Sequence, residues 1–216
     1  MASVDLAALP AGATDLLLPP DGRLLFFALP EVGDHTSMGT VIHVPADATV
    51  TRRDPYAWNS ANTAKGDRVF ASYPEGRSGR GPTCRSLTTS SSFPGEEEAV
   101  YLPGHPYCSE LVEIWEDTKD LIAPSAQMQI GGYADEEAVE FDPVDVAASL
   151  AAQAVEAGHW DGPVSDDVAD WVLLADWYAG RDVEKREGAT VHWVIQREDL
   201  AARRFERVFT TVFWNP

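Results

Sequence analysis

The chain has 216 residues, of which 44% are apolar and 10% aromatic, so it can bury a sizeable core and is not a mostly disordered protein. Its formal net charge of −19 at pH 7 repels nucleic acid and anionic membrane surfaces, and it speeds association with a basic protein. The same charge equally serves plain solubility, and charge alone does not decide between these two interpretations.

Targeting signals and cysteines indicate the compartment. No apolar run reaches the roughly 20 residues that span a bilayer, and the N-terminus lacks the basic and apolar regions of a secretory signal. Cys84 and Cys108 are too few for a disulfide scaffold, and no metal-ligand spacing surrounds them. We therefore expect a soluble, cytoplasmic protein with free thiols.

The N-terminal third of the chain predicts a helical turn and an antiparallel meander. Residues 5–9 can form a short helical turn before a segment punctuated by prolines and glycines. The continuous apolar run at 22–29 predicts a strand that is buried on both faces. Residues 40–44 and 67–72 predict two further short strands.

Residues 74–95 are rich in glycine, arginine, serine and threonine, which predicts a mobile, solvated loop. Arg77, Arg80 and Arg85 lie among its glycines and could bind an anion, but the spacing of a phosphate-binding loop is absent. A solvated insertion is the favoured interpretation.

Two helices are predicted in the middle of the chain. Apolar residues recur at helical spacing within 107–121, with acidic residues between them. The helix at 143–157 has Asp142 as its cap, Pro143 in its first position and Gly158 beyond its end. Between the helices, the Gly131–Gly132 pair indicates a turn or a close backbone approach.

The C-terminal part predicts a strand at 171–178 and then a strand, a helical turn and a second strand between 188 and 216. Val191, Trp193 and Ile195 alternate with His192 and Val194, as expected for one buried and one partly exposed face. In the helical turn, acids precede arginines, the order that the helix dipole favours, and a second β-rich run begins at Phe205.

A short sequence is repeated near the two ends of the chain, since Asp5-Leu-Ala-Ala8 recurs as Asp199-Leu-Ala-Ala202. We interpret the repeat as a duplication whose N-terminal copy is cut short, with nothing before it. The expected architecture is one α+β domain over residues 1–216, β-rich, with antiparallel sheets, internal duplication of a strand-helix-strand unit and two main helices.

Several of these segments resemble the YwqG-like proteins, a bacterial domain of unknown function. The resemblance rests on residues 4–9 and 18–27, Gly131-Gly-Tyr133, Asp170-Trp-Val-Leu-Leu174 and residues 188–205. It implies an α+β fold with internal duplication and a chain that lacks the family's N-terminal portion. It brings no established activity, but it suggests an immunity role, because some relatives are encoded near toxin and immunity genes.

No motif for metal binding or catalysis emerges from the titratable residues. His35, His43, His105, His159 and His192 are dispersed, so structural, hydrogen-bonded histidines are favoured over metal ligands. Acids crowd 135–145 and recur as Asp161, Asp166, Asp167 and Asp170, but a calcium-loop register is missing, and we interpret them as solvated. Ser90, Ser91 and Ser92 have no neighbouring base for nucleophilic catalysis.

Aromatic residues could form a ligand groove, but core positions are the favoured interpretation. Strand and helix periodicity already accounts for three of them. The residues in question are Tyr56, Trp58, Trp115, Trp160, Trp171, Trp177, Trp193 and Trp214.

Two hypotheses for function remain. The leading one is a non-enzymatic protein-binding module, without cofactor or metal and without nucleic-acid or membrane partners, whose acidic surface engages a basic protein, as an immunity protein would. The alternative is a small-molecule-binding protein or an enzyme with a cleft between the duplicated halves. The sequence names no catalytic, cofactor-binding or metal-binding residue for either.

Overall fold

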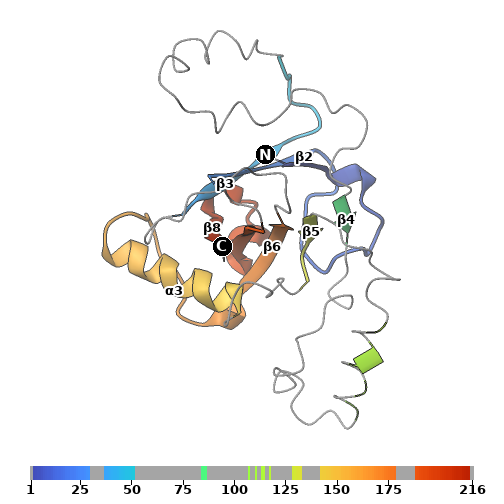
Figure 1. The fold of residues 1–216 in the computed structure, drawn as a ribbon. Helices are drawn as coiled ribbons and strands as arrows, with labels where there is room; N and C mark the ends of the chain where they lie inside the picture. The colour runs from blue at the N-terminus through green and yellow to red at the C-terminus, as the bar shows by residue number, and fades with distance from the viewer. Residues whose placement is uncertain are drawn as a thin grey trace, which may run out of the picture.

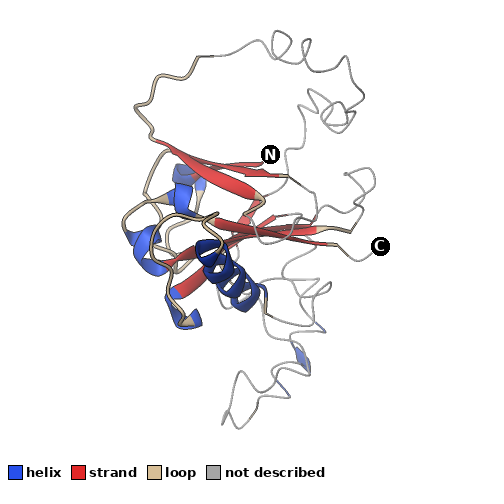
Figure 2. Ribbon diagram, turned by 90° about the vertical axis from the view of Figure 1, so that its left-hand side faces the viewer, coloured by secondary structure: helices blue, strands red, loops and turns tan. Residues whose placement is uncertain are grey.

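The computed structural model describes residues 2–29, 37–51, 84–86, 128–132, 142–178 and 188–214, with the single positions 107, 110, 113, 114 and 117. These residues form three layers (Figure 1), in which a small sheet, sheet A, packs on one face of a larger sheet, sheet B. A helix packs on the opposite face of sheet B (Figure 2). The predicted α+β fold with antiparallel sheets is confirmed.

Sheet A contains three antiparallel strands in the order β1-β2-β3. Its elements are β1 (Ala2–Asp5), the 3-10 turn η1 (Leu6–Ala8), β2 (Arg23–Ala28) and β3 (Gly39–Val44). The predicted helical turn and both predicted strands are present. The prediction that β2 is buried on both faces is wrong: Leu24 and Phe26 are buried, whereas Leu25 and Phe27 are partly exposed, because only one face of sheet A packs on sheet B.

Sheet B has the strand order β4-β5-β6-β7-β8, and its last four strands are antiparallel. The strands are β4 (Cys84–Ser86), β5 (Met128–Ile130), β6 (Trp171–Tyr178), β7 (Thr190–Gln196) and β8 (Phe209–Phe213). β4 pairs in parallel with β5, within the segment for which we predicted a loop. β6 has the predicted bounds, and β8 begins later than predicted because the 3-10 turn η5 (Phe205–Arg207) precedes it.

The helix against sheet B is α3 (Pro143–Glu156), and it has the predicted ends. The Asp142 side chain accepts a hydrogen bond from the Val144 amide at 2.8 Å, and Gly158 follows the helix with a φ of +72°. Its buried stripe consists mainly of alanines, which lets the helix approach the strands closely. None of the helices in the described part of the chain combines the length and hydrophobicity needed to cross a membrane.

Only isolated positions of the helix predicted at 107–121 are described. Glu110, Glu113, Ile114 and Asp117 are helical, and all four are exposed. Ile114, one of the apolar residues at helical spacing, is 60% exposed. The predicted strand at 67–72 and the loop at 74–95, apart from β4, lie outside the described residues.

The core between the two sheets is continuous. Phe26 from sheet A and Trp193 from sheet B meet edge to face, with ring centroids 5.2 Å apart. The Trp193 indole Nε1 donates to the Phe27 carbonyl at 3.1 Å, so this side chain links the sheets by packing and by a hydrogen bond. Leu174 and Ile195 complete this part of the core. The facing sides of the sheets are therefore packed together.

The two ends of the chain follow a similar path. β1, η1 and β2 form a strand, a helical turn and an antiparallel strand, as do β7, α4 (Arg197–Ala201) and β8. A strand therefore precedes Asp5-Leu-Ala-Ala, and our expectation that nothing comes before it is wrong. Asp5 is exposed and caps η1, whereas Asp199 is buried, so the repeated aspartates have different roles. Duplication remains a prediction.

Candidate functional site

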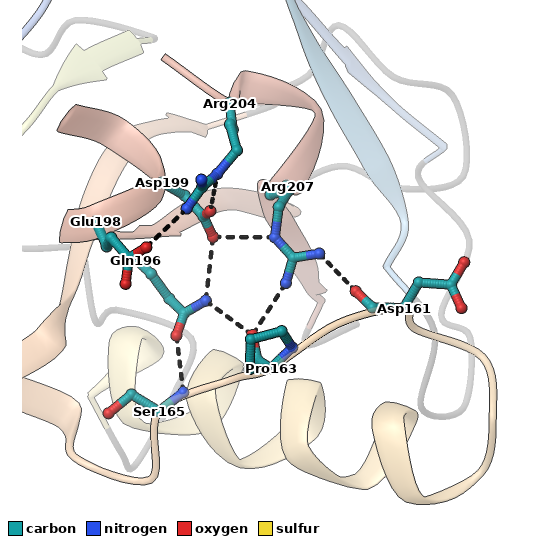
Figure 3. Close-up of polar contacts among 8 residues, drawn as sticks. All are labelled: Asp161, Pro163, Ser165, Gln196, Glu198, Asp199, Arg204 and Arg207. Atoms are coloured by element: carbon teal, nitrogen blue, oxygen red, sulfur yellow. Dashed lines mark hydrogen bonds and ion pairs between the residues drawn. The ribbon is translucent and has the colours of Figure 1, made fainter. Parts of the chain in front are cut away.

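The first cluster of polar side chains surrounds Asp199 in α4 (Figure 3). Asp199 is only 2% exposed, and its carboxylate accepts hydrogen bonds from Arg204 Nε at 2.6 Å and Arg207 Nε at 3.1 Å. The Gln196 amide donates a third at 3.1 Å. A buried carboxylate is stable only when it is paired in this way, and here both carboxylate oxygens are used.

The backbone brings the two arginines back toward Asp199. The helix ends at Ala201, and Arg203 adopts a φ of 58°, which turns the chain. The Arg204 amide then donates to the Asp199 carbonyl at 2.8 Å. Asp199 first, and Glu198 second, raise the pKa of the Arg204 guanidinium by accepting its hydrogen bonds.

Arg207 and Gln196 connect this turn to the segment that follows α3. Arg207 donates to the carbonyls of Asp161 and Pro163, and Gln196 Oε1 accepts from the Ser165 amide at 2.7 Å (Figure 3). We call the group Asp199, Arg204, Arg207 and Gln196 the Asp199 clasp. Every charged group in it has a partner within the protein, so its chemistry is structural: it fastens the segment at 161–165 to sheet B.

The Arg207 guanidinium also stacks on the α3 side of the molecule. Its Cζ atom lies 5.7 Å from the centroid of the Trp160 ring, which itself packs edge-on against Phe209 with centroids 5.4 Å apart. Gly162 has a φ of +89°, and a Cβ there would come within 2.9 Å of Arg207 Nη1. A side chain at Gly162 would therefore require the Arg207 guanidinium to shift.

A second cluster lies on the α3-side face of sheet B. Gln129, Asp176, His192 and Thr211 are directly opposite one another on β5, β6, β7 and β8, and we call them the polar row. Paired residues of antiparallel strands point to the same face, with Cβ atoms about 4.5–5.5 Å apart. Asp176, His192 and Thr211 are buried. The row thus places a carboxylate, an imidazole and a hydroxyl side by side away from solvent.

The polar row contains the only groups in the described part of the chain whose arrangement resembles that of an acid–base site. A carboxylate beside a histidine can orient the imidazole for proton transfer. Phe213 packs edge-on against His192 with ring centroids 5.4 Å apart, and Thr211 Oγ1 has no hydrogen-bond partner in the described structure. An unpaired buried hydroxyl is costly, and a bound polar molecule could satisfy it.

The histidines named in the sequence analysis have different environments in the structure. His43 is half-buried, its Nε2 lies 3.4 Å from the Asp21 carbonyl, and its ring packs against Phe205, as predicted for a structural histidine. His192 is fully buried instead of half-buried, and His159 is exposed. His35 and His105 lie outside the described residues. No group of three or more potential metal ligands gathers within the described ranges.

The acids of the segment after α3 are solvated, as predicted. Asp161, Asp166, Asp167 and Asp170 are all exposed. Asp167 caps the 3-10 turn η4 (Val168–Asp170) by accepting from the Ala169 amide at 2.9 Å, and Asp170 accepts from the Ser165 hydroxyl at 2.5 Å.

Other predicted candidates are scattered or not described. Trp171 and Trp193 lie in the core as predicted, while Trp160, Trp177 and Trp214 are partly buried at its edge. The positions that the structure leaves undescribed are Tyr56, Trp58, Arg77, Arg80, Ser90, Ser91, Ser92, Cys108, Trp115 and residues 135–141, together with the side chains of Cys84 and Arg85.

Sequence reasoning missed both clusters, although each has a sequence signal. Asp176 and His192 are polar residues inside otherwise apolar strands, which is the pattern of a buried polar group. Asp199 lies between Glu198 and Leu200, where helical spacing places it on the buried side. What the sequence does not contain is which strands are neighbours.

These observations define the class of the protein: it is a small α+β domain in which two sheets and one helix pack together. The sequence model of the family described as Domain of unknown function (DUF1963) matches residues 1–213, so the chain belongs to this family. The match lends no support to the expected loss of an N-terminal portion, and the closer relation to YwqG-like proteins stays a prediction. No curated protein matches the chain significantly.

Proposed function

We propose that this protein is a non-enzymatic binding module that engages a basic protein through its acidic surface. The observation that supports the proposal is the unequal exposure of acidic and basic side chains. The exposed acids are Asp5, Asp15, Asp21, Asp47, Glu110, Glu113, Asp117, Asp145, Glu156, Asp161, Asp166, Asp167, Asp170, Glu198 and Glu206, and the exposed bases of the described chain are Arg23, Arg197 and Arg203.

The remaining described arginines serve the fold. Arg207 is held between Asp199 and two backbone carbonyls, and Arg204 lies between Asp199 and Glu198. Even the exposed Arg197 donates its Nε to the Ala169 carbonyl at 2.8 Å. Since these positive charges have partners inside the molecule, the acids of the surface are left largely uncompensated.

The negative electrostatic field of these uncompensated acids affects how the protein associates with other molecules. It raises the association rate of a positively charged protein and disfavours nucleic acid, and both effects weaken as salt rises. An immunity-like role in the cytoplasm, as the resemblance to YwqG-like proteins suggests, is one biological setting in which tight binding of a basic protein is required. The proposal itself requires only the basic partner.

The test is recovery of a partner from an extract of the native host. The full chain is immobilised and exposed to extract at moderate salt, and retained proteins are identified by mass spectrometry. We expect a basic protein to be retained. A variant that combines Glu156→Gln, Asp161→Asn and Asp166→Asn should retain less of it, because three negative charges are removed from the surface. The variant should still fold, because these carboxylates are exposed and accept none of the hydrogen bonds described above.

The control is Ala147→Gly, which changes one buried alanine of α3 and none of the charges: it lowers stability but preserves the acidic surface. It should retain the partner at a temperature at which it is folded. Failure of the unmodified protein to retain any basic protein, or equal retention by the neutralised variant, would count against the proposal.

The polar row supports a second candidate, a small-molecule-binding protein or enzyme. The cleft that we expected between the duplicated halves does not fit sheets A and B, whose facing sides form one apolar core. The polar row lies on the other face of sheet B. If it holds a ligand, a small neutral polar molecule such as glycerol should raise the melting temperature of the protein more than that of a Thr211→Val variant. Equal shifts in both proteins would contradict this candidate.

A further inference from the structure

Sheet A presents one face to the core and one face away from it. On the inner face, Val4, Leu24, Phe26 and Val41 are buried against sheet B. Side chains alternate along a strand, so the residues between them lie on the opposite face. Figure 2 shows sheet A at the edge of the layered structure, with sheet B and α3 on its inner side.

The opposite face of sheet A is apolar at its centre. Leu25 of β2 pairs with Ile42 of β3, Phe27 pairs with Thr40, and Arg23 pairs with Val44. Ile42 is 47% exposed, and Leu25, Phe27 and Val44 are partly exposed. We call Leu25, Phe27, Ile42 and Val44 the outer patch. These neighbouring side chains form a continuous apolar surface, which is typical of an interaction site.

Three acids lie at the end of sheet A where β1 ends, β2 begins and β3 ends. Asp5 is directly across from the exposed Arg23 on the neighbouring strand. Asp21 lies two residues before Arg23, and its carbonyl is 3.4 Å from His43 Nε2 of β3. Asp47 follows β3 in the turn in which the Ala48 amide donates to the Pro45 carbonyl. All three acids are exposed, against the one exposed base Arg23, so this end of sheet A carries more negative than positive charge.

We propose that the outer patch is where the basic partner docks, by a segment in which a short apolar run adjoins several lysines or arginines. This inference rests on the proposed function and assigns it a place. The apolar run would cover the outer patch, and the adjoining cations would lie near Asp21 and Asp47. A second copy of the chain is disfavoured as the occupant, because two molecules that each carry a net charge of −19 repel one another.

The probe for this proposal is a synthetic peptide with a valine–threonine run followed by four lysines. It is titrated into the full, isotope-labelled chain, and amide chemical shifts are followed by NMR. We expect the largest shifts in β2 and β3, around Leu25 and Ile42. A peptide with four glutamates in place of the lysines, and one with serines in place of the valines, should each bind at least about tenfold more weakly.

Two variants test the contact itself. Ile42→Glu should weaken binding of the lysine peptide at least about tenfold, although the added carboxylate increases the attraction for lysine, because it breaks the apolar surface. The matched control is Val50→Glu, which adds the same charge at an apolar residue that is 77% exposed and outside the patch. It should leave affinity within about twofold. Both side chains are exposed, so both variants should keep the far-ultraviolet spectrum of the unmodified protein.

Three results would overturn the inference. Shifts confined to other elements, or equal binding by the Ile42→Glu variant, would show that the outer patch is not the contact. A dimer of the unmodified protein in light scattering that Ile42→Glu dissociates would assign the patch to a second copy. A host partner that binds the Ile42→Glu variant as tightly as it binds the unmodified protein would refute the docking site but leave the proposed function intact. Recovery of no basic host protein would refute the proposed function itself.

Discussion

Trp193 is the residue that links the two sheets most directly. Its ring packs on Phe26, and its indole donates to the Phe27 carbonyl. Trp193→Ala should lower the free energy of unfolding by about 3–5 kcal/mol, because the lost side chain leaves a cavity between the sheets. Urea denaturation measures this change. Leu17→Ala, at an exposed leucine, is the control and should stay within about 0.5 kcal/mol of the unmodified protein. An unchanged midpoint for Trp193→Ala would contradict the core described above.

Asp199 and Glu198 provide a matched pair, since both bind Arg204 but only Asp199 is buried. We expect Asp199→Asn to lower the free energy of unfolding by about 2–3 kcal/mol, because Arg207 and Arg204 lose their charged acceptor. Glu198→Gln removes a partner that is 88% exposed and should cost less than about 1 kcal/mol. Chemical denaturation of the two variants measures the difference. Equal effects would show that burial does not matter to the clasp.

The turn after β5 depends on glycine in two ways. Gly131 has a φ of +68°, and a Cβ there would lie 2.8 Å from Thr14 Oγ1, so the predicted turn and the predicted close approach are both present. Gly158 after α3 has a similar φ of +72° but open space around it. Gly158→Ala should therefore cost about 1 kcal/mol from backbone strain alone. Gly131→Ala should cost at least about 1 kcal/mol more, because it adds the clash. Thermal denaturation of both variants tests this order.

Local patterns predicted the elements whose signal lies within a few residues. β6, β7 and α3 were found from apolar periodicity and from the capping residues Asp142 and Gly158, because these signals are set by local geometry. Burial was predicted less well. β7 is buried on both faces, because α3 covers one side and sheet A the other, and neither contact can be read from the alternation in β7 itself.

The arginines after α4 show a second limit. The sequence predicted Arg203 and Arg204 in the last turn of the helix, where they would stabilise its dipole, and this prediction is wrong. The helix ends at Ala201, and the chain reverses at Arg203 so that Arg204 and Arg207 reach Asp199. A buried carboxylate needs these partners more than the helix terminus needs a cation. The polar row was likewise invisible, since it requires the order of β5, β6, β7 and β8.

At the scale of the whole molecule, the net charge of −19 should oppose compaction. Salt shortens the range of this repulsion, so the melting temperature at pH 7 should rise by about 2–5 °C between 20 and 300 mM sodium chloride. The exposed arginine contacts weaken over the same range, but they are few compared with the exposed acids. Scanning calorimetry in the two buffers measures the balance, and a fall in melting temperature would show that ion pairs outweigh repulsion.

The most direct test of the central claim is the salt at which a host protein leaves the immobilised full chain. We predict that a basic protein is retained at about 0.1 M salt and released by increasing salt, since the attraction between its cations and the exposed carboxylates is screened. Release should occur at lower salt from the column that carries the Ile42→Glu variant than from the Val50→Glu column. Retention of no basic protein, or retention that salt does not weaken, would contradict the account of an acidic surface that binds a basic partner.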